Sequence, residues 1–185
     1  MAFIYVPYER LDDHFELNKT IFRNVIALLT KMIEEKLTSR GVNLDTSIAP
    51  IGSYAPVIIS GNLVFVSGQI AVENSTPTKE VKYKGKVGKD ITTEDAKKSA
   101  ELCVINCLVQ LKSALGDLER IKKIVKLSGF VNCDASFTDH PTVLNGASDF
   151  LVQIFGEAGK HARIAVGASS LPMNSSTEID MIVEV

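Results

Sequence analysis

The sequence contains no tryptophan, and it has only 3 cysteines and 3 histidines among 185 residues. The odd number of cysteines shows no paired framework, which argues against a disulfide-built fold and favours a reducing compartment. The histidines His14, His140 and His161 lack metal-binding spacing, so we expect no metal site. The net charge is only −2 and the pI about 5.9, which argues against electrostatic binding of nucleic acid.

Long apolar runs are absent as well. No stretch reaches the roughly 18 apolar residues of a membrane span, and the N-terminus lacks the basic and apolar regions of a signal peptide. We therefore expect a cytoplasmic protein with no membrane partner. Hydrophobic residues still make up 45% of the chain, which is enough for one domain to bury a core.

Three stretches show the period of an amphipathic helix. The first spans residues 21–37. The second begins at Thr92, which together with Asp95 resembles a capping box, and it ends at Gly116. Its apolar stripe includes Cys103 and Cys107, which we interpret as structural core cysteines. The third begins near Pro141 and ends at Gly156.

The remaining apolar segments have the character of strands. A turn sequence, S-G-N, joins Pro56–Ile59 to Leu63–Ile70 and predicts a hairpin. Further strands are expected over Ile124–Val131, Ala162–Ala168 and Glu178–Val185, with a short one near 81–87. The order predicts an α+β fold with one sheet covered on one face by two helices. An apolar sheet face is rarely left in water, so the other face predicts an oligomer.

No nucleophile–base constellation is visible, and Ser67 does not lie in a G-x-S-x-G motif. The candidates are polar residues inside apolar elements, namely Tyr54, Ser67, Asn145, Arg163 and Glu178. Arg163 is either a plain surface residue whose stem covers its neighbours or a planar fork that binds a carboxylate through two bonds. Glu178 either pairs with a surface lysine or holds a water for attack.

Two stretches together resemble the signatures of a known family. Residues 49–70 read APIGSYAPVIISGNLVFVSGQI, and residues 162–180 read ARIAVGASSLPMNSSTEID. Both resemble signatures of the YjgF/Rid family of reactive-intermediate imine deaminases, formerly called endoribonuclease L-PSP. The resemblance covers residues 45–185 and leaves 1–44 as an N-terminal extension and helix. The extension and the loop after Gly85 resemble a less characterised branch.

The resemblance implies a chorismate-mutase-like fold in a homotrimer, with a central barrel and clefts between subunits. It implies that Arg163 binds a substrate carboxylate and that Glu178 positions water. Where the deaminases usually have cysteine, this chain has Ala165, whose backbone carbonyl is expected to contact the substrate nitrogen. The full expected substrate-binding set is Tyr54, Ser67, Gly68, Asn145, Arg163 and Ala165.

The implied reaction is hydrolysis of a small 2-imino or enamine acid to a keto acid and ammonia. It needs no cofactor, because a protonated imine is already electrophilic. Three alternatives stay open at this point. One is a trimer that binds a small carboxylate metabolite without turnover, another is a ribonuclease, and the third is a chaperone-like or purely structural role, for which the sequence gives no positive sign. The acidic pI and the absence of a histidine pair argue against the ribonuclease.

Overall fold

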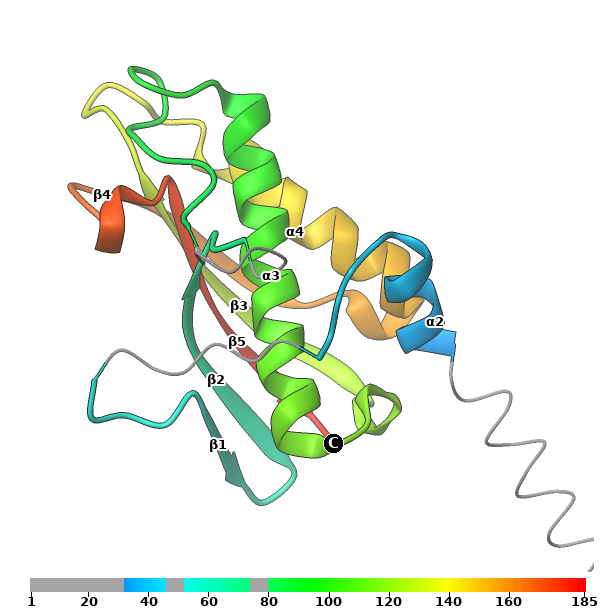
Figure 1. The fold of residues 1–185 in the computed structure, drawn as a ribbon. Helices are drawn as coiled ribbons and strands as arrows, with labels where there is room; N and C mark the ends of the chain where they lie inside the picture. The colour runs from blue at the N-terminus through cyan, green and yellow to red at the C-terminus, as the bar shows by residue number, and fades with distance from the viewer. Residues whose placement is uncertain (1–31, 46–51, 74–79) are drawn as a thin grey trace, which may run out of the picture.

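A computed structural model of the chain describes residues 32–45, 52–73 and 80–185. One mixed sheet of five strands carries two long helices on one face (Figure 1). The elements are α2 Met32–Ser39, β1 Val57–Ser60, β2 Leu63–Ile70, α3 Thr93–Leu115, β3 Lys123–Asn132, α4 His140–Phe155, β4 Ala162–Ala168 and β5 Thr177–Glu184, with short 3-10 turns η1 Leu118–Arg120, η2 Gly156–Gly159 and η3 Pro172–Asn174.

The strand order in the sheet is β1-β2-β5-β3-β4. The pairs β1–β2, β2–β5 and β3–β5 are antiparallel, whereas β3 and β4 are parallel. Parallel neighbours need a crossover, and α4 supplies it. β4 is an edge strand, because it is the last in the strand order. The N-terminal end of α4 lies near the C-terminal end of β4, where His140 and Gly167 line the same hollow.

The predicted elements are largely confirmed. The hairpin, the strands β3, β4 and β5, and the helices α3 and α4 all lie where the periodicity placed them. Thr92 accepts a hydrogen bond from the Asp95 backbone N–H at 3.1 Å, and Gly116 ends α3 in the left-handed region. Cys103 and Cys107 are fully buried in the core, as expected. Among the described residues, no helix is long and apolar enough to cross a membrane.

The expected strand near 81–87 is wrong. Val81, Lys84 and Val87 each form only isolated bridges, and these go to different segments of the chain. The backbone N–H of Gly85 donates to Asn174 and that of Val87 donates to Asn132, so no single partner strand runs beside this segment. Alternating apolar residues indicate a half-buried segment, but a strand also needs one continuous partner.

The helix expected over 21–37 is described only from Met32, and its earlier part lies outside the described residues. The described part, α2, lies beside the end of α4 (Figure 1). Leu37 is fully buried. The Glu34 carboxylate accepts two hydrogen bonds from Lys112 Nζ of α3, at 2.7 and 2.9 Å, and one from the Leu118 backbone N–H at 3.2 Å. Both apolar burial and charge therefore hold α2 against the main body.

We expect Leu37→Ala to lower the free energy of unfolding by about 2–5 kcal/mol, the usual cost of truncating a fully buried leucine. Denaturant unfolding followed by circular dichroism measures this change. Glu35→Ala is the matched control, because Glu35 lies on the exposed side of the same helix. An unfolding midpoint for Leu37→Ala equal to that of the control would show that α2 does not contribute to the core.

Candidate active site

Arg163 lies on the edge strand β4, on the face that α4 covers. Its Nη1 atom donates to Asn145 Oδ1 and to Ser148 Oγ, each at 3.0 Å, and both acceptors belong to α4. The structure therefore brings together Asn145 and Arg163, two residues of the substrate-binding set that the family resemblance implies. Ala165 lies two residues further along β4, on the same face.

The charge of Arg163 is not neutralised within the described part of the chain. Its two partners are a neutral amide and a neutral hydroxyl, and no described carboxylate forms an ion pair with it. The side chain is also exposed. Since a guanidinium carries five N–H donors and Nη1 supplies two, three donors at Nε and Nη2 remain for a ligand. An exposed cation held from one side by neutral acceptors suits the binding of an anion.

Glu178 lies on the opposite face of the sheet. Along β5 the residues alternate, with Thr177, Ile179 and Met181 buried beneath the helices and Glu178 and Asp180 on the other side. Burial, and secondly the charge of Asp180, raise the pKa of the Glu178 carboxyl. A carboxyl whose pKa is raised above its ordinary value is suited to accept a proton from water.

A bulge in β2 makes room for this carboxyl. The register of β2 against β5 shifts between Val66 and Gln69, which leaves Ser67 and Gly68 out of the regular ladder. A Cβ atom at Gly68 would overlap Glu178 Oε1, so only glycine allows the carboxyl to lie against the backbone here. Gly68 and Glu178 were both predicted from the sequence, and the structure places them in contact.

Ser67 connects the bulge to the segment that carries Tyr54. Its hydroxyl donates to the Ala55 carbonyl at 2.8 Å, and its backbone N–H donates to the Pro56 carbonyl at 2.9 Å. Tyr54, just before these carbonyls, is 48% exposed. The Ser67 hydroxyl proton is committed to Ala55, so toward a ligand this oxygen can only accept.

The predicted residues thus form two groups that do not meet within one chain. Asn145, Arg163 and Ala165 form the arginine group, on the helix-covered face at β4. Tyr54, Ser67, Gly68 and Glu178 form the glutamate group, around the β2 bulge and β5. Across the sheet, Glu178 pairs with Ile70 and Phe130, and Phe130 pairs with Val166. Arg163 pairs with Leu127, which pairs with Met181. Arg163 and Glu178 therefore lie in different rows of paired residues.

The helix-free face around the glutamate group is apolar and hollowed. Ile58, Phe65 and Ile164 are 54%, 40% and 47% exposed. A hollow of about 490 Å³ includes Ser67, Gly68 and Asp180 in its lining. This confirms that the sheet has an uncovered apolar face.

A second hollow, of about 670 Å³, lies at the C-terminal end of β4 and contains none of the predicted residues. Half-buried Cys133 lines it, with Sγ 3.4 Å from His140 Nε2. Across the described residues, no three His, Cys, Asp or Glu side chains are grouped so that they could hold a metal ion.

We expect iodoacetamide to label Cys133 in the native protein and to leave Cys103 and Cys107 unmodified. Burial raises the pKa of the Cys103 thiol to about 12 and that of Cys107 well above its usual value, and neither is exposed. The thiolate is the species that reacts with iodoacetamide, so both cysteines are protected by their burial and by their raised pKa. Peptide mass spectrometry before and after denaturation measures the labelling. Equal labelling of all three in the native state would contradict the buried placement of the α3 cysteines.

Two residues of the arginine group's surroundings were not singled out from the sequence, namely Ser148 and His161. A weak signal was present, because Ser148 follows Asn145 by about one helical turn, and His161 lies two residues before Arg163, directly ahead of β4. Both spacings place the side chains on the same side as their predicted neighbours.

The sequence model of the family described as "YjgF/chorismate mutase-like, putative endoribonuclease" matches residues 34–185. Protein TCP17 of Trypanosoma cruzi is 37% identical over 156 residues, which are 83% of this chain and 94% of that protein. A 2-iminobutanoate/2-iminopropanoate deaminase of Dermatophagoides farinae is 25% identical over 136 residues, which are 74% of this chain and 88% of the deaminase.

The crystal structure of an Agrobacterium tumefaciens protein of unknown function superposes with a TM-score of 0.74 and is 42% identical, covering 84% of this chain and 95% of that one. The mixed sheet with two covering helices and the family match agree with one another. The chain belongs to the YjgF/chorismate mutase-like family.

Proposed function

We propose that the protein hydrolyses small 2-imino or enamine acids to keto acids and ammonia, in clefts between copies of the chain. The observation that carries this proposal is Arg163, an exposed cation held by two neutral acceptors with three donors left for an anion. A relative is named as a deaminase of 2-iminobutanoate and 2-iminopropanoate, and both of these substrates are small carboxylates.

The site is completed by a second copy. Within one chain the arginine group and the glutamate group lie on opposite faces of the sheet, so one substrate cannot reach both. The helix-free face carries exposed Ile58, Phe65 and Ile164, an apolar surface that a neighbouring copy would bury. We propose a homotrimer in which three such faces surround a central barrel and each cleft takes Arg163 from one copy and Glu178 from the next.

In this cleft, Nε and Nη2 of Arg163 bind the substrate carboxylate through two parallel hydrogen bonds. The backbone carbonyl of Ala165 accepts a hydrogen bond from the substrate nitrogen, and Tyr54 forms an apolar wall that excludes bulk water. Ser67 and Gly68 hold the bulge against which the Glu178 carboxyl lies.

Glu178 then acts on water. It accepts one proton as the water oxygen bonds to the imine carbon, which gives a carbinolamine. Glu178 gives this proton to the nitrogen and becomes a carboxylate again. The C–N bond then breaks, the hydroxyl of the carbinolamine passes its proton to Glu178 as the carbonyl forms, and ammonia leaves. The raised pKa of Glu178 favours the first of these steps, because the conjugate base of a weaker acid accepts a proton from water more readily. No metal or organic cofactor takes part in these steps.

Two other activities fit parts of the molecule. A non-catalytic binder of a small carboxylate needs only the arginine group. The ribonuclease in the family's description has less support, because phosphodiester cleavage by side chains calls for an acid–base pair beside a basic groove. His140 and His161 instead contact Cys133 and Ser148 respectively.

A keto-acid release assay tests the proposal. A small imino acid is generated in situ from an amino acid, and its hydrolysis is timed with the wild type, Arg163→Ala and Glu178→Ala. Acceleration by the wild type that is lost in both variants supports the deaminase. A wild type that binds the keto acid but gives no acceleration with any of several imines supports the binder instead.

A further inference from the structure

Arg163 is the end of a hydrogen-bonded chain that begins at a histidine. The imidazole of His161 has its Nδ1 atom 2.6 Å from the Gly159 carbonyl oxygen, and its Nε2 atom lies 3.0 Å from Ser148 Oγ. The same Ser148 oxygen accepts from Arg163 Nη1 at 3.0 Å. Ser148 therefore lies between an imidazole and the guanidinium.

The chemistry of the groups fixes who donates. A carbonyl oxygen can only accept, so Nδ1 of His161 carries the proton. In neutral imidazole Nε2 is then a lone pair, and the Ser148 hydroxyl donates to it. With its proton committed to His161, the Ser148 oxygen presents its lone pairs to Arg163, which can only donate. Each of these polar atoms thus acts either as a donor or as an acceptor, and this assignment holds only while His161 is neutral.

We propose that Ser148 and His161 are positioning residues for Arg163, and that protonation of His161 weakens carboxylate binding by the arginine. The proposal rests on the proposed function, because it concerns the same anion site. Protonated His161 would donate from Nε2 to the Ser148 oxygen. The serine hydroxyl would then have to rotate its own proton away from the imidazole. One oxygen would then lie between two cations, and the guanidinium would lose its fixed orientation.

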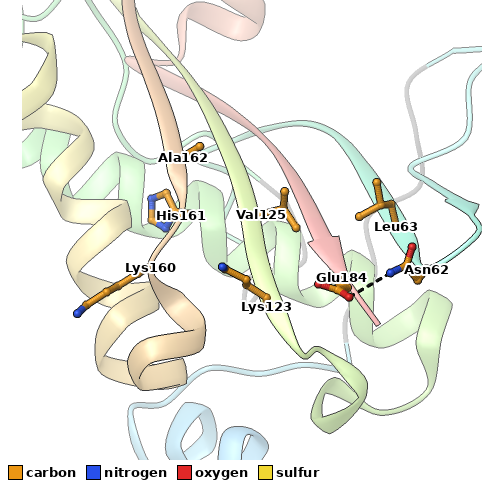
Figure 2. A pocket seen from close by; sticks show the side chains of 8 residues that line it. All are labelled: Asn62, Leu63, Lys123, Val125, Lys160, His161, Ala162 and Glu184. Carbon is orange, nitrogen blue, oxygen red and sulfur yellow. Dashed lines mark hydrogen bonds between the residues drawn. The ribbon is translucent and has the colours of Figure 1, made fainter.

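The neutral form of His161 is the one that the fold favours. Burial, opposed in part by the bond to Gly159 and reinforced by the charge of Arg163, lowers the pKa of the imidazole. His161 also lines a hollow of about 660 Å³ at the end of the sheet where β4 begins (Figure 2), so protons from solvent can reach it.

The other charged groups around that hollow are Lys123, Lys160 and Glu184, and in the described part of the chain none of them bonds the His161 ring or Ser148. Lys160 forms an ion pair with Glu157 at 2.7 Å. Glu184 of β5 accepts from Asn62 at 3.0 Å, as the dashed line in Figure 2 shows, and Lys123 of β3 lies across the same hollow. Ser148 is the α4 residue that bonds the ring. Arg163 is therefore the charged group that protonation of His161 affects, because both side chains bond the same Ser148 oxygen.

Binding of pyruvate, a small 2-keto acid, tests the inference by calorimetric titration between pH 5 and 8. We expect Ser148→Ala to weaken binding about threefold to tenfold, the usual effect of losing one hydrogen bond, and Ser148→Thr to restore it because it keeps the hydroxyl. Wild-type affinity should fall once the pH drops through the pKa of His161, which lies below the ordinary histidine value of about 6.5. His161→Gln should remove this pH dependence. Ser136→Ala and His140→Gln are the matched controls, since neither contacts Arg163.

Failure of this inference can be told from failure of the proposed function. If Arg163→Ala binds pyruvate as the wild type does, or the wild type binds none, the anion site is wrong. NMR titration of His161 then tests the hydrogen bonds from His161 through Ser148 to Arg163 without any ligand. The pKa of His161 should rise in Arg163→Ala, because the nearby positive charge is gone. Three results would each overturn the inference: wild-type affinity in Ser148→Ala, a loss of affinity at low pH that survives His161→Gln, or a His161 pKa that does not move in Arg163→Ala.

Discussion

A mixture of two inactive variants, Arg163→Ala and Glu178→Ala, is expected to recover about a quarter of wild-type activity once their subunits exchange, if neighbouring copies form each site head to tail. Each cleft needs an intact arginine from one copy and an intact glutamate from the next. In an equal mixture each requirement is met about half the time. The measurement is keto-acid release after partial denaturation and joint refolding of the two variants.

A double variant provides the matched control, because it carries the same two substitutions in one chain. Mixed equally with wild type, it should also leave about a quarter of the activity if sites are shared, but about half if each chain holds its own site. No recovery in the first mixture, together with half the activity in the second, would mean that Arg163 and Glu178 act within one chain. Because Arg163 and Glu178 lie on opposite faces of the sheet, the substrate would then have to reach both of them by another route.

The elements that the sequence predicted well are those whose signal is local. The apolar stripe of α3 repeats with the helical period, and Thr92 and Gly116 mark its ends through their own backbone chemistry. Arg163 and Glu178 were predicted as a pair because both lie in the stretch 162–180, which resembles one family signature. The alternation along β5 indicates the face on which Glu178 lies, but β4 shows no clear alternation of burial. The face of Arg163 is therefore known only from the structure.

Ser148 shows the other limit of local patterns. A serine in the middle of a helix has no distinctive spacing, and its role arises only because β4 brings both His161 and Arg163 beside it. Segment 81–87 fails for a related reason. Its residues alternate, but their backbone partners lie on several different segments of the fold.

Glu178→Gln should abolish most turnover and slightly stabilise the protein at neutral pH. Glutamine cannot accept a proton from water, so kcat should fall on the order of 10²-fold or more while KM changes little. The pKa of Glu178 is raised in the folded state by burial and then by Asp180, so the folded protein holds this proton more tightly than the unfolded chain. Stability is therefore lost as the pH rises from the unfolded pKa through the folded one.

At pH 7 the wild type bears that cost and the glutamine variant does not, so the thermal midpoint of the glutamine variant should be higher. Because the carboxyl is only half-buried, screening by water keeps the gain below about 1 kcal/mol. The difference should shrink as the pH falls toward the unfolded pKa, where wild-type Glu178 is itself protonated.

Asp180→Asn is the companion variant, since it removes the second cause of the raised pKa and leaves Glu178 in place. It should keep most of kcat and move the acid limb of the pH–rate profile to lower pH, because Glu178 then ionises more readily. Thermal melts across pH and kcat profiles of the two variants measure both effects. A Glu178→Gln protein with wild-type kcat would remove Glu178 from the reaction. An unchanged acid limb in Asp180→Asn would mean that the limb reports another group.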